Sequence, residues 1–238
     1  MILLLSLTTA HAFETSEVDH LELKWFRDSI EFQALTTGTF RNGLAAVEAR
    51  SVKLNKKKTD WTVVVDIDET LLDNSPYFLE LAAYHRLFDW ASWDAWCERR
   101  TAEPIAGAPE FIAGVREAGG RVAFISNRMV GTQQATIDNL KLHGMWSDDD
   151  LICLKTDDKA YSKIARRAEV AAGKGECSWD GVSPVAVAYF GDTITDFPSV
   201  DEGGDPADHW GVDYFVLPNP MYGGWEHGVT RPDLLPAP

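Results

Sequence analysis

The sequence is poor in positive charge, poor in cysteine and free of any apolar run long enough to cross a membrane. Lys and Arg number 22 against 37 Asp and Glu, which gives a formal net charge of -15. Nucleic acids and anionic membranes are bound through basic side chains that neutralise phosphate, so a nucleic-acid polymer is excluded as the expected partner. The three cysteines are too few and too scattered for a disulfide scaffold or a zinc site.

One pair among Cys97, Cys153 and Cys177 could still form a bridge if the protein is exported. Cys153 lies inside the apolar run Leu151–Leu154, which favours a buried small hydrophobic residue at this position. Whether Cys97 and Cys177 pair stays open.

The first 12 residues are apolar and end in Ala10-His11-Ala12, the small-x-small pattern of a signal-peptide cleavage site. A membrane span needs about 20 apolar residues, so residues 1–12 predict a periplasmic or secreted protein without a stable membrane anchor. No cysteine follows the run for lipid attachment. Because no Lys or Arg precedes the apolar residues, a buried N-terminal strand or helix is the alternative.

The rest of the chain alternates short apolar runs with helical periodicity. Four runs are expected to be strands, at 61–67, 122–125, 185–190 and 214–217, and helical patterns at 109–118, 132–143 and 160–172 separate them. This alternation predicts an α/β fold, a Rossmann-like parallel sheet flanked by helices. We expect an N-terminal helical extension at 13–60, a sheet domain at 61–238, and a small α-helical cap, rich in Trp and Tyr, at about 74–106.

Polar clusters follow three of the expected strands: Asp66-Ile67-Asp68-Glu69-Thr70, Ser126-Asn127-Arg128, and Gly191-Asp192-Thr193-Ile194-Thr195-Asp196. In open parallel sheets, ligands bind beyond the carboxyl ends of the strands. The sequence therefore predicts one site built from all three clusters.

A carboxylate at a strand end can attack phosphorus and form an aspartyl-phosphate, the role expected for Asp66. Asp68, two residues on, is expected to protonate the leaving oxygen and then to activate water. These carboxylates and a phosphoryl group are all anionic, and hard oxygen ligands select Mg²⁺. We expect Mg²⁺ to bind Asp66, the main-chain carbonyl of Asp68, and Asp192, with Asp196 holding the water ligands of the metal.

The phosphoryl oxygens need donors of their own. Ser126 offers a hydroxyl and nearby backbone N–H groups, Asn127 lies beside it, and a basic residue should complete the set. Lys163 is the preferred basic residue, with Lys155 and Lys159 as alternatives.

Together these motifs resemble those of the haloacid dehalogenase (HAD) superfamily: Asp66–Thr70 as motif one, Ser126 as motif two, Lys163 as motif three and Gly191–Asp196 as motif four. The second aspartate, Asp68, is typical of the phosphatases in that superfamily.

Further stretches resemble one branch, the class C (subfamily IIIB) bacterial acid phosphatases, also described as 5'-nucleotidases and related to outer-membrane lipoprotein acid phosphatases. They are Leu23-Lys24-Trp25, Asp73–Tyr77, Ser126–Arg128 and Leu217–Glu226. The resemblance implies a secreted or surface-bound hydrolase that needs Mg²⁺ and acts on nucleoside 5'-monophosphates and aryl phosphates. Enzymes of this family often form homodimers. Two features depart from the family: the lipid-anchor cysteine is missing, and Gly173–Ser183 is extra sequence.

The substrate is a small phosphomonoester on this interpretation. Tyr77, Trp93 and Tyr222 are candidates to stack on a nucleobase, although aromatic residues at helical spacing also pack cap cores. Two other functions stay open: a non-catalytic binding or storage protein with the same fold, and a phosphotransferase that passes the phosphoryl group to an alcohol instead of water.

Overall fold

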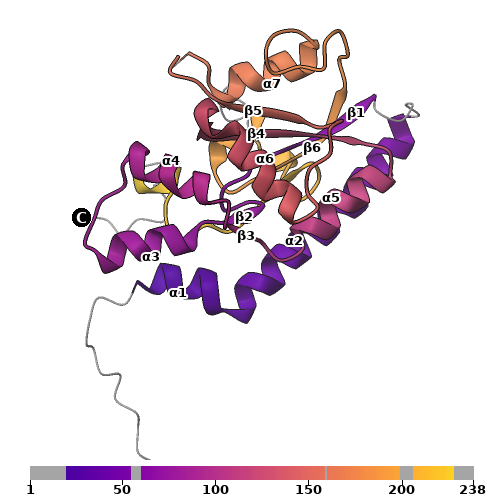
Figure 1. Cartoon of the computed structure of the whole chain (residues 1–238). Coiled ribbons are helices and arrows are strands. Elements are labelled where there is room, and N and C mark those ends of the chain that lie inside the picture. The colour runs from indigo at the N-terminus through magenta and orange to yellow at the C-terminus, as the bar shows by residue number, and fades with distance from the viewer. Residues whose placement is uncertain (1–19, 55–59, 159, 199–205, 228–238) are drawn as a thin grey trace, which may run out of the picture.

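Five parallel strands form the central sheet of the computed structural model, which describes residues 20–54, 60–158, 160–198 and 206–227 (Figure 1). The strand order is β5-β4-β1-β6-β7. Their bounds are β1 Trp61–Val65, β4 Arg121–Met129, β5 Leu151–Lys155, β6 Val185–Gly191 and β7 Tyr214–Val216. The predicted α/β fold is confirmed. The expected signal peptide at 1–12 lies outside the described residues.

One strand was missing from the sequence-based expectation. Leu151–Lys155 forms β5 at the edge of the sheet and pairs with β4 through Ala123↔Leu151 and Ile125↔Cys153. Its apolar run is short and has no alternation along it, so periodicity does not separate a strand from any other buried segment.

The central strands are buried on both faces, as continuous β-branched runs predict. Along β1, Val63 and Val65 pack into the larger core cluster, whereas Val64 points to the opposite face and joins a second cluster with Cys153 and Val170. The period of two along a strand produces this division.

Helices cover the two faces. The bounds are α1 Leu21–Asp28, α2 Ile30–Leu54, α5 Ala108–Glu117, α6 Gln133–Leu142 and α7 Lys163–Ala172, and short 3-10 turns lie at 130–132 (η1), 194–196 (η2), 206–208 (η3) and 224–227 (η4). The long helix α2 runs across one face beside α5, and α7 lies on the other (Figure 1). Phe40 of α2 packs against Phe111 of α5 and Phe190 of β6, so this N-terminal helix belongs to the main core.

A helical insertion follows β1. It begins and ends in a two-stranded antiparallel ribbon, β2 (Leu72–Asp73) with β3 (Glu103–Pro104), and contains α3 (Ser75–Ala83) and α4 (Trp90–Arg99). Both helices stand to one side of the sheet (Figure 1). Asp89 caps α4 by accepting a hydrogen bond from the backbone N–H of Ser92. In the described part of the chain, every helix is too short or too polar to serve as a transmembrane span.

The cysteines differ from the sequence-based interpretation. Cys153 of β5 is bonded to Cys177, with Cα atoms 5.3 Å apart, and is not simply a buried hydrophobic residue. Cys97 is the buried free thiol, in α4. The bridge ties the extra segment Gly173–Ser183 to the edge of the sheet. Sequence spacing alone gives no pairing, because the contact depends on how α7 returns along β5.

Candidate active site

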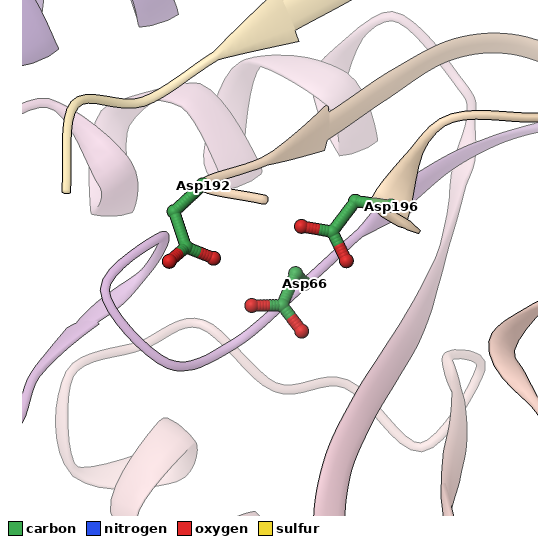
Figure 2. A group of neighbouring side chains, drawn as sticks. All are labelled: Asp66, Asp192 and Asp196. Carbon is green, nitrogen blue, oxygen red and sulfur yellow. The ribbon is translucent and has the colours of Figure 1, made fainter. Parts of the chain in front are cut away.

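Three carboxylates converge at the carboxyl ends of two neighbouring strands. Asp66 follows β1, Asp192 follows β6, and Asp196 ends the short turn η2. The two strands pair in parallel, with Val65 opposite Phe190, so the residues that follow them lie at the same edge. One oxygen of each carboxylate lies within 4.8 Å of the others. Figure 2 shows the three side chains directed toward one another.

A buried lysine of α7 joins this group. Lys163 is the first residue of α7, whose N-terminus is capped by the side chain of Ser162. The Lys163 ammonium lies 2.5 Å from Oδ1 of Asp66 and 2.5 Å from Oδ1 of Asp196. It compensates one of three negative charges, so two remain uncompensated if every carboxylate is ionised.

Burial strongly disfavours those charges. Burial raises the pKa of Asp66 to about 7, although the nearby Lys163 ammonium opposes the rise. Burial also raises the pKa of Asp192 well above its usual value, and the charges of Asp66 and Asp196 add to the effect. The site therefore favours either bound protons or additional positive charge.

Asp196 is fixed by its own turn. Its Oδ2 accepts hydrogen bonds from the backbone N–H and the hydroxyl of Thr193, at 3.0 and 3.1 Å. The backbone of Gly191 passes so close that a Cβ atom there would lie 2.2 Å from that oxygen. Asp192 is held by Asn219, whose side-chain amide donates to Asp192 Oδ2 at 2.7 Å. Among the described residues, no donor is hydrogen-bonded to the other oxygen of Asp192, Oδ1.

This donor set suits a divalent cation. Carboxylate oxygens are hard ligands, they are mostly buried, and the uncompensated charge of two matches one divalent ion. Both oxygens of Asp196 accept hydrogen bonds, and so do both oxygens of Asp66, from Lys163 and, at 3.4 Å, from the hydroxyl of Thr70.

The second strand tip supplies donors beside Asp66. Ser126 is buried in β4, and the neighbouring Asn127 is exposed with its side-chain oxygen held by Arg166 at 2.8 Å. Arg166 is fully buried and also donates to the carbonyl oxygens of Ser126 at 2.5 Å and Cys153 at 3.0 Å. One guanidinium thus fixes the tip of β4 against β5 and α7.

Asp68 has a different set of partners from Asp66. Its Oδ1 accepts from Arg128 Nε at 2.8 Å and from Asn74 Nδ2 at 2.9 Å, and its Oδ2 accepts from the Ser126 hydroxyl at 3.0 Å. Glu69, next along the chain, is fully buried with φ at 54° and accepts a hydrogen bond from the hydroxyl of Tyr222. Burial raises the pKa of Glu69 well above its usual value.

The three aromatic candidates differ in exposure. Tyr77 and Trp93 pack edge to face inside the insertion, where they are 3% and 5% exposed. Tyr222 is partly exposed and its ring lies 5.1 Å from that of Phe78. Among the lysines, Lys163 reaches the carboxylates, the ammonium of Lys155 lies over the ring of Trp90 at 4.5 Å, and Lys159 lies outside the described residues.

A family model for the HAD superfamily, subfamily IIIB (acid phosphatase), matches residues 16–225. The chain belongs to this subfamily. Two solved structures of the class C acid phosphatase from Bacillus anthracis are similar, one of them with tungstate bound. That structure has a TM-score of 0.72 and 28% identity over 87% of this chain and 85% of the other, and the second has a TM-score of 0.72 and 26% identity over 90% of each.

Acid phosphatase 1 of Solanum lycopersicum is 29% identical over 122 residues, 51% of this chain. The match spans about half of that relative, 47% of its length. The resemblance to HAD subfamily IIIB predicted from the motifs is confirmed.

Several residues at this subfamily IIIB site had no role assigned from the sequence. Arg128 and Asn74 bind Asp68, Arg166 fixes Ser126 and Asn127, and Asn219 holds Asp192. Asn74, Arg128 and Asn219 lie inside the stretches that resemble the family, and Arg166 does not. Their place in those stretches was the only sign in the sequence that these three residues belong to the site. Nothing in the local pattern says which acidic residue each one contacts.

Proposed function

We propose that the protein is a Mg²⁺-dependent acid phosphatase that hydrolyses small phosphomonoesters through an aspartyl-phosphate on Asp66. The observation that carries the proposal is the buried cluster of Asp66, Asp192 and Asp196 around Lys163 at the strand ends. Family membership supports the same chemistry.

In the first step, a carboxylate oxygen of Asp66 attacks phosphorus and the bond from phosphorus to the leaving oxygen breaks. Asp68 gives its proton to that oxygen. In the second step, water attacks the phosphoryl group, Asp68 takes the proton, and the bond to Asp66 breaks. Inorganic phosphate leaves and both carboxyl groups return to their starting states.

Basic and polar side chains hold the transferring group. Lys163 is placed beside the nucleophile, where its charge offsets the charge of phosphoryl oxygens, and Ser126 and Asn127 offer donors from the tip of β4. When bound by Asp66 and Asp192, with Asp196 as an outer partner, Mg²⁺ would neutralise charge and align the phosphoryl oxygens.

For the substrate, we propose nucleoside 5'-monophosphates and aryl phosphates. Tyr222 has the partly exposed ring that stacking on a base requires, and its hydroxyl is anchored to Glu69. Tyr77 and Trp93 support the wall of the insertion from within.

We also propose that the protein acts outside the cytoplasm. A disulfide such as Cys153–Cys177 is kept in oxidising compartments and is rare in the cytosol. Cleavage after Ala12 predicts that the mature chain begins at Phe13, which N-terminal sequencing of the exported protein checks. The homodimer implied by the resemblance stays a prediction, and light scattering of the purified protein checks it.

Turnover of nitrophenyl phosphate and of a panel of nucleoside monophosphates, with Mg²⁺ and with chelator, tests the main proposal. Asp66→Asn should lower turnover by about 10³-fold or more, because the amide is a poor nucleophile. Asp213→Asn is the matched control, since Asp213 is also buried but pairs with Arg50 and His209 away from the site.

Metal-dependent turnover that persists in Asp66→Asn would refute the nucleophile. Phosphate binding without turnover by the unaltered protein would instead favour a binding protein. Phosphorylated products formed from an added alcohol would favour a phosphotransferase.

A further inference from the structure

Arg128 is buried at the tip of β4 and directs its donors at three residues from different parts of the chain. It is 1% exposed. Its Nε lies 2.8 Å from Asp68 Oδ1, one terminal nitrogen lies 3.2 Å from Asn74 Oδ1, and the other lies 3.3 Å from the hydroxyl of Thr136. An arginine with this many fixed donors has one orientation, so it holds its partners rigidly.

Asn74 completes a closed network with the same carboxylate. Its Nδ2 donates to Asp68 Oδ1 at 2.9 Å, while its Oδ1 accepts from Arg128 and, at 2.9 Å, from the indole of Trp96. Asn74 is itself fully buried at the start of α3. The network therefore runs from Asp68 through Arg128 and Asn74 to α4 of the insertion.

The other oxygen of Asp68, Oδ2, is bound by Ser126, which we also expect to donate to the phosphoryl group. The Ser126 hydroxyl donates to Asp68 Oδ2 at 3.0 Å and accepts from the backbone N–H of Arg128 at 3.0 Å. A phosphoryl oxygen that takes the Ser126 hydroxyl as its donor releases Asp68 Oδ2. Arg128 and Asn74 can keep Oδ1 in place while the released oxygen turns to the leaving group.

We propose that Arg128 is the positioning residue of Asp68, which it holds, together with Asn74, for proton transfer to the leaving oxygen and from water. The inference rests on the proposed phosphatase function. Arg128 does not reach the reacting atoms; its effect passes through Asp68. Because Asn74 also binds Trp96, the position of the proton donor is tied to the helices of the insertion.

The test compares two substrates whose leaving groups differ in their need for a proton. Nitrophenolate is a stable anion and leaves without protonation, whereas the alkoxide of a nucleoside 5'-monophosphate must be protonated as it leaves. Since the leaving group departs during phosphoryl transfer to Asp66, kcat/KM reports this step and is independent of the later hydrolysis. Arg128→Met should lower kcat/KM by about 100-fold for the nucleotide and by less than about 10-fold for nitrophenyl phosphate, within the range of general acid catalysis.

A second readout concerns the intermediate. Hydrolysis of the aspartyl-phosphate needs Asp68 as a base whichever group has left. With labelled nitrophenyl phosphate and acid quench, Arg128→Met should therefore retain a larger fraction of covalently bound phosphate than the unaltered protein. A general weakening of the fold would lower both steps and leave that fraction unchanged.

Arg116→Met is the matched control, because Arg116 also forms an ion pair with a buried aspartate, Asp150. That aspartate accepts a hydrogen bond from the backbone of Val122 at the amino end of β4, whereas Asp68 is bound toward the carboxyl end. Arg116→Met should change kcat/KM for the nucleotide and for nitrophenyl phosphate by the same factor. Arg128→Lys keeps the positive charge but lacks the planar set of guanidinium donors. It should also lose more kcat/KM for the nucleotide than for nitrophenyl phosphate, by a smaller factor than Arg128→Met. If Arg128→Met does not unfold cooperatively, Arg128→Lys is the variant that tests the inference.

Equal losses on both substrates in the Arg128 variants, or no loss, would overturn the inference while the phosphatase proposal stands. Absence of turnover in the unaltered protein would overturn both.

Discussion

Replacing Lys163 with Met removes a buried cation that lies 2.5 Å from both Asp66 and Asp196. Removing one partner of a buried ion pair costs about 3–5 kcal/mol, because the other charge remains buried and unpaired. For a chain of this length, 1 kcal/mol corresponds to a change of about 2–4 °C in melting temperature. In chelator near neutral pH, Lys163→Met should therefore melt roughly 6–20 °C below the unaltered protein.

The loss should depend on pH in a defined direction. Burial raises the pKa of Asp66 from 3.8 to about 7. A carboxyl group with a raised pKa in the folded state contributes stability that is fully present below 3.8 and is lost as pH rises through 7. Lys163 opposes this rise in pKa, so its removal makes the ionised form still less favourable. The difference in melting temperature between Lys163→Met and the unaltered protein should widen from about pH 5 to about pH 8.

Thermal unfolding followed by circular dichroism in chelator measures both effects. Lys155→Met is the control, since the Lys155 ammonium lies over the ring of Trp90 rather than beside a carboxylate in this network. It should cost no more than about 1 kcal/mol, without a trend in pH. A loss of stability below about 1 kcal/mol for Lys163→Met, or a loss that is the same at about pH 5 and about pH 8, would refute the electrostatic account of the site.

Three further perturbations test other parts of the site and fold. Gly191→Ala should lower turnover by about 10-fold or more, because the new Cβ displaces Asp196; unchanged turnover would show that Asp196 need not be fixed. Reducing the Cys153–Cys177 bridge, which closes a loop across 24 residues, should lower stability by about 3 kcal/mol in a thermal melt, and an unchanged melt would contradict this. Added Mg²⁺ should raise the melting temperature more at about pH 8 than at about pH 5, because the ion must displace the proton that burial favours on Asp66; a shift independent of pH would argue against Asp66 as a ligand.

Local pattern was enough to predict four of the five strands of the sheet, and the edge at which their carboxyl ends meet. Asp66 and Asp192 each follow an apolar run, and a parallel sheet brings the ends of such runs together whatever the residues between them. The same rule brought Ser126 to this edge. Lys163 was harder to place, because a helix N-terminus can approach the edge from several directions.

Contacts between distant residues of ordinary type could not be predicted. Asn74, Trp96 and Arg128 each have several common structural uses, and 54 residues separate Asn74 from Arg128 in their hydrogen bond. The Cys153–Cys177 pair and the edge strand Leu151–Lys155 fall in the same class, since each depends on the path of α7 and of the segment that follows it. Sequence periodicity carries no information about such a path.

Asp66 and Asp68 show what a motif leaves undetermined. The strand β1 ends at Val65, and the spacing of two residues does not say which cation each carboxylate contacts. Asp66 is hydrogen-bonded to Lys163 and Asp68 to Arg128, so the two aspartates of one motif pair with different cationic side chains. This division of charge allows one carboxylate to remain a nucleophile while its neighbour exchanges protons, because each is stabilised independently of the other.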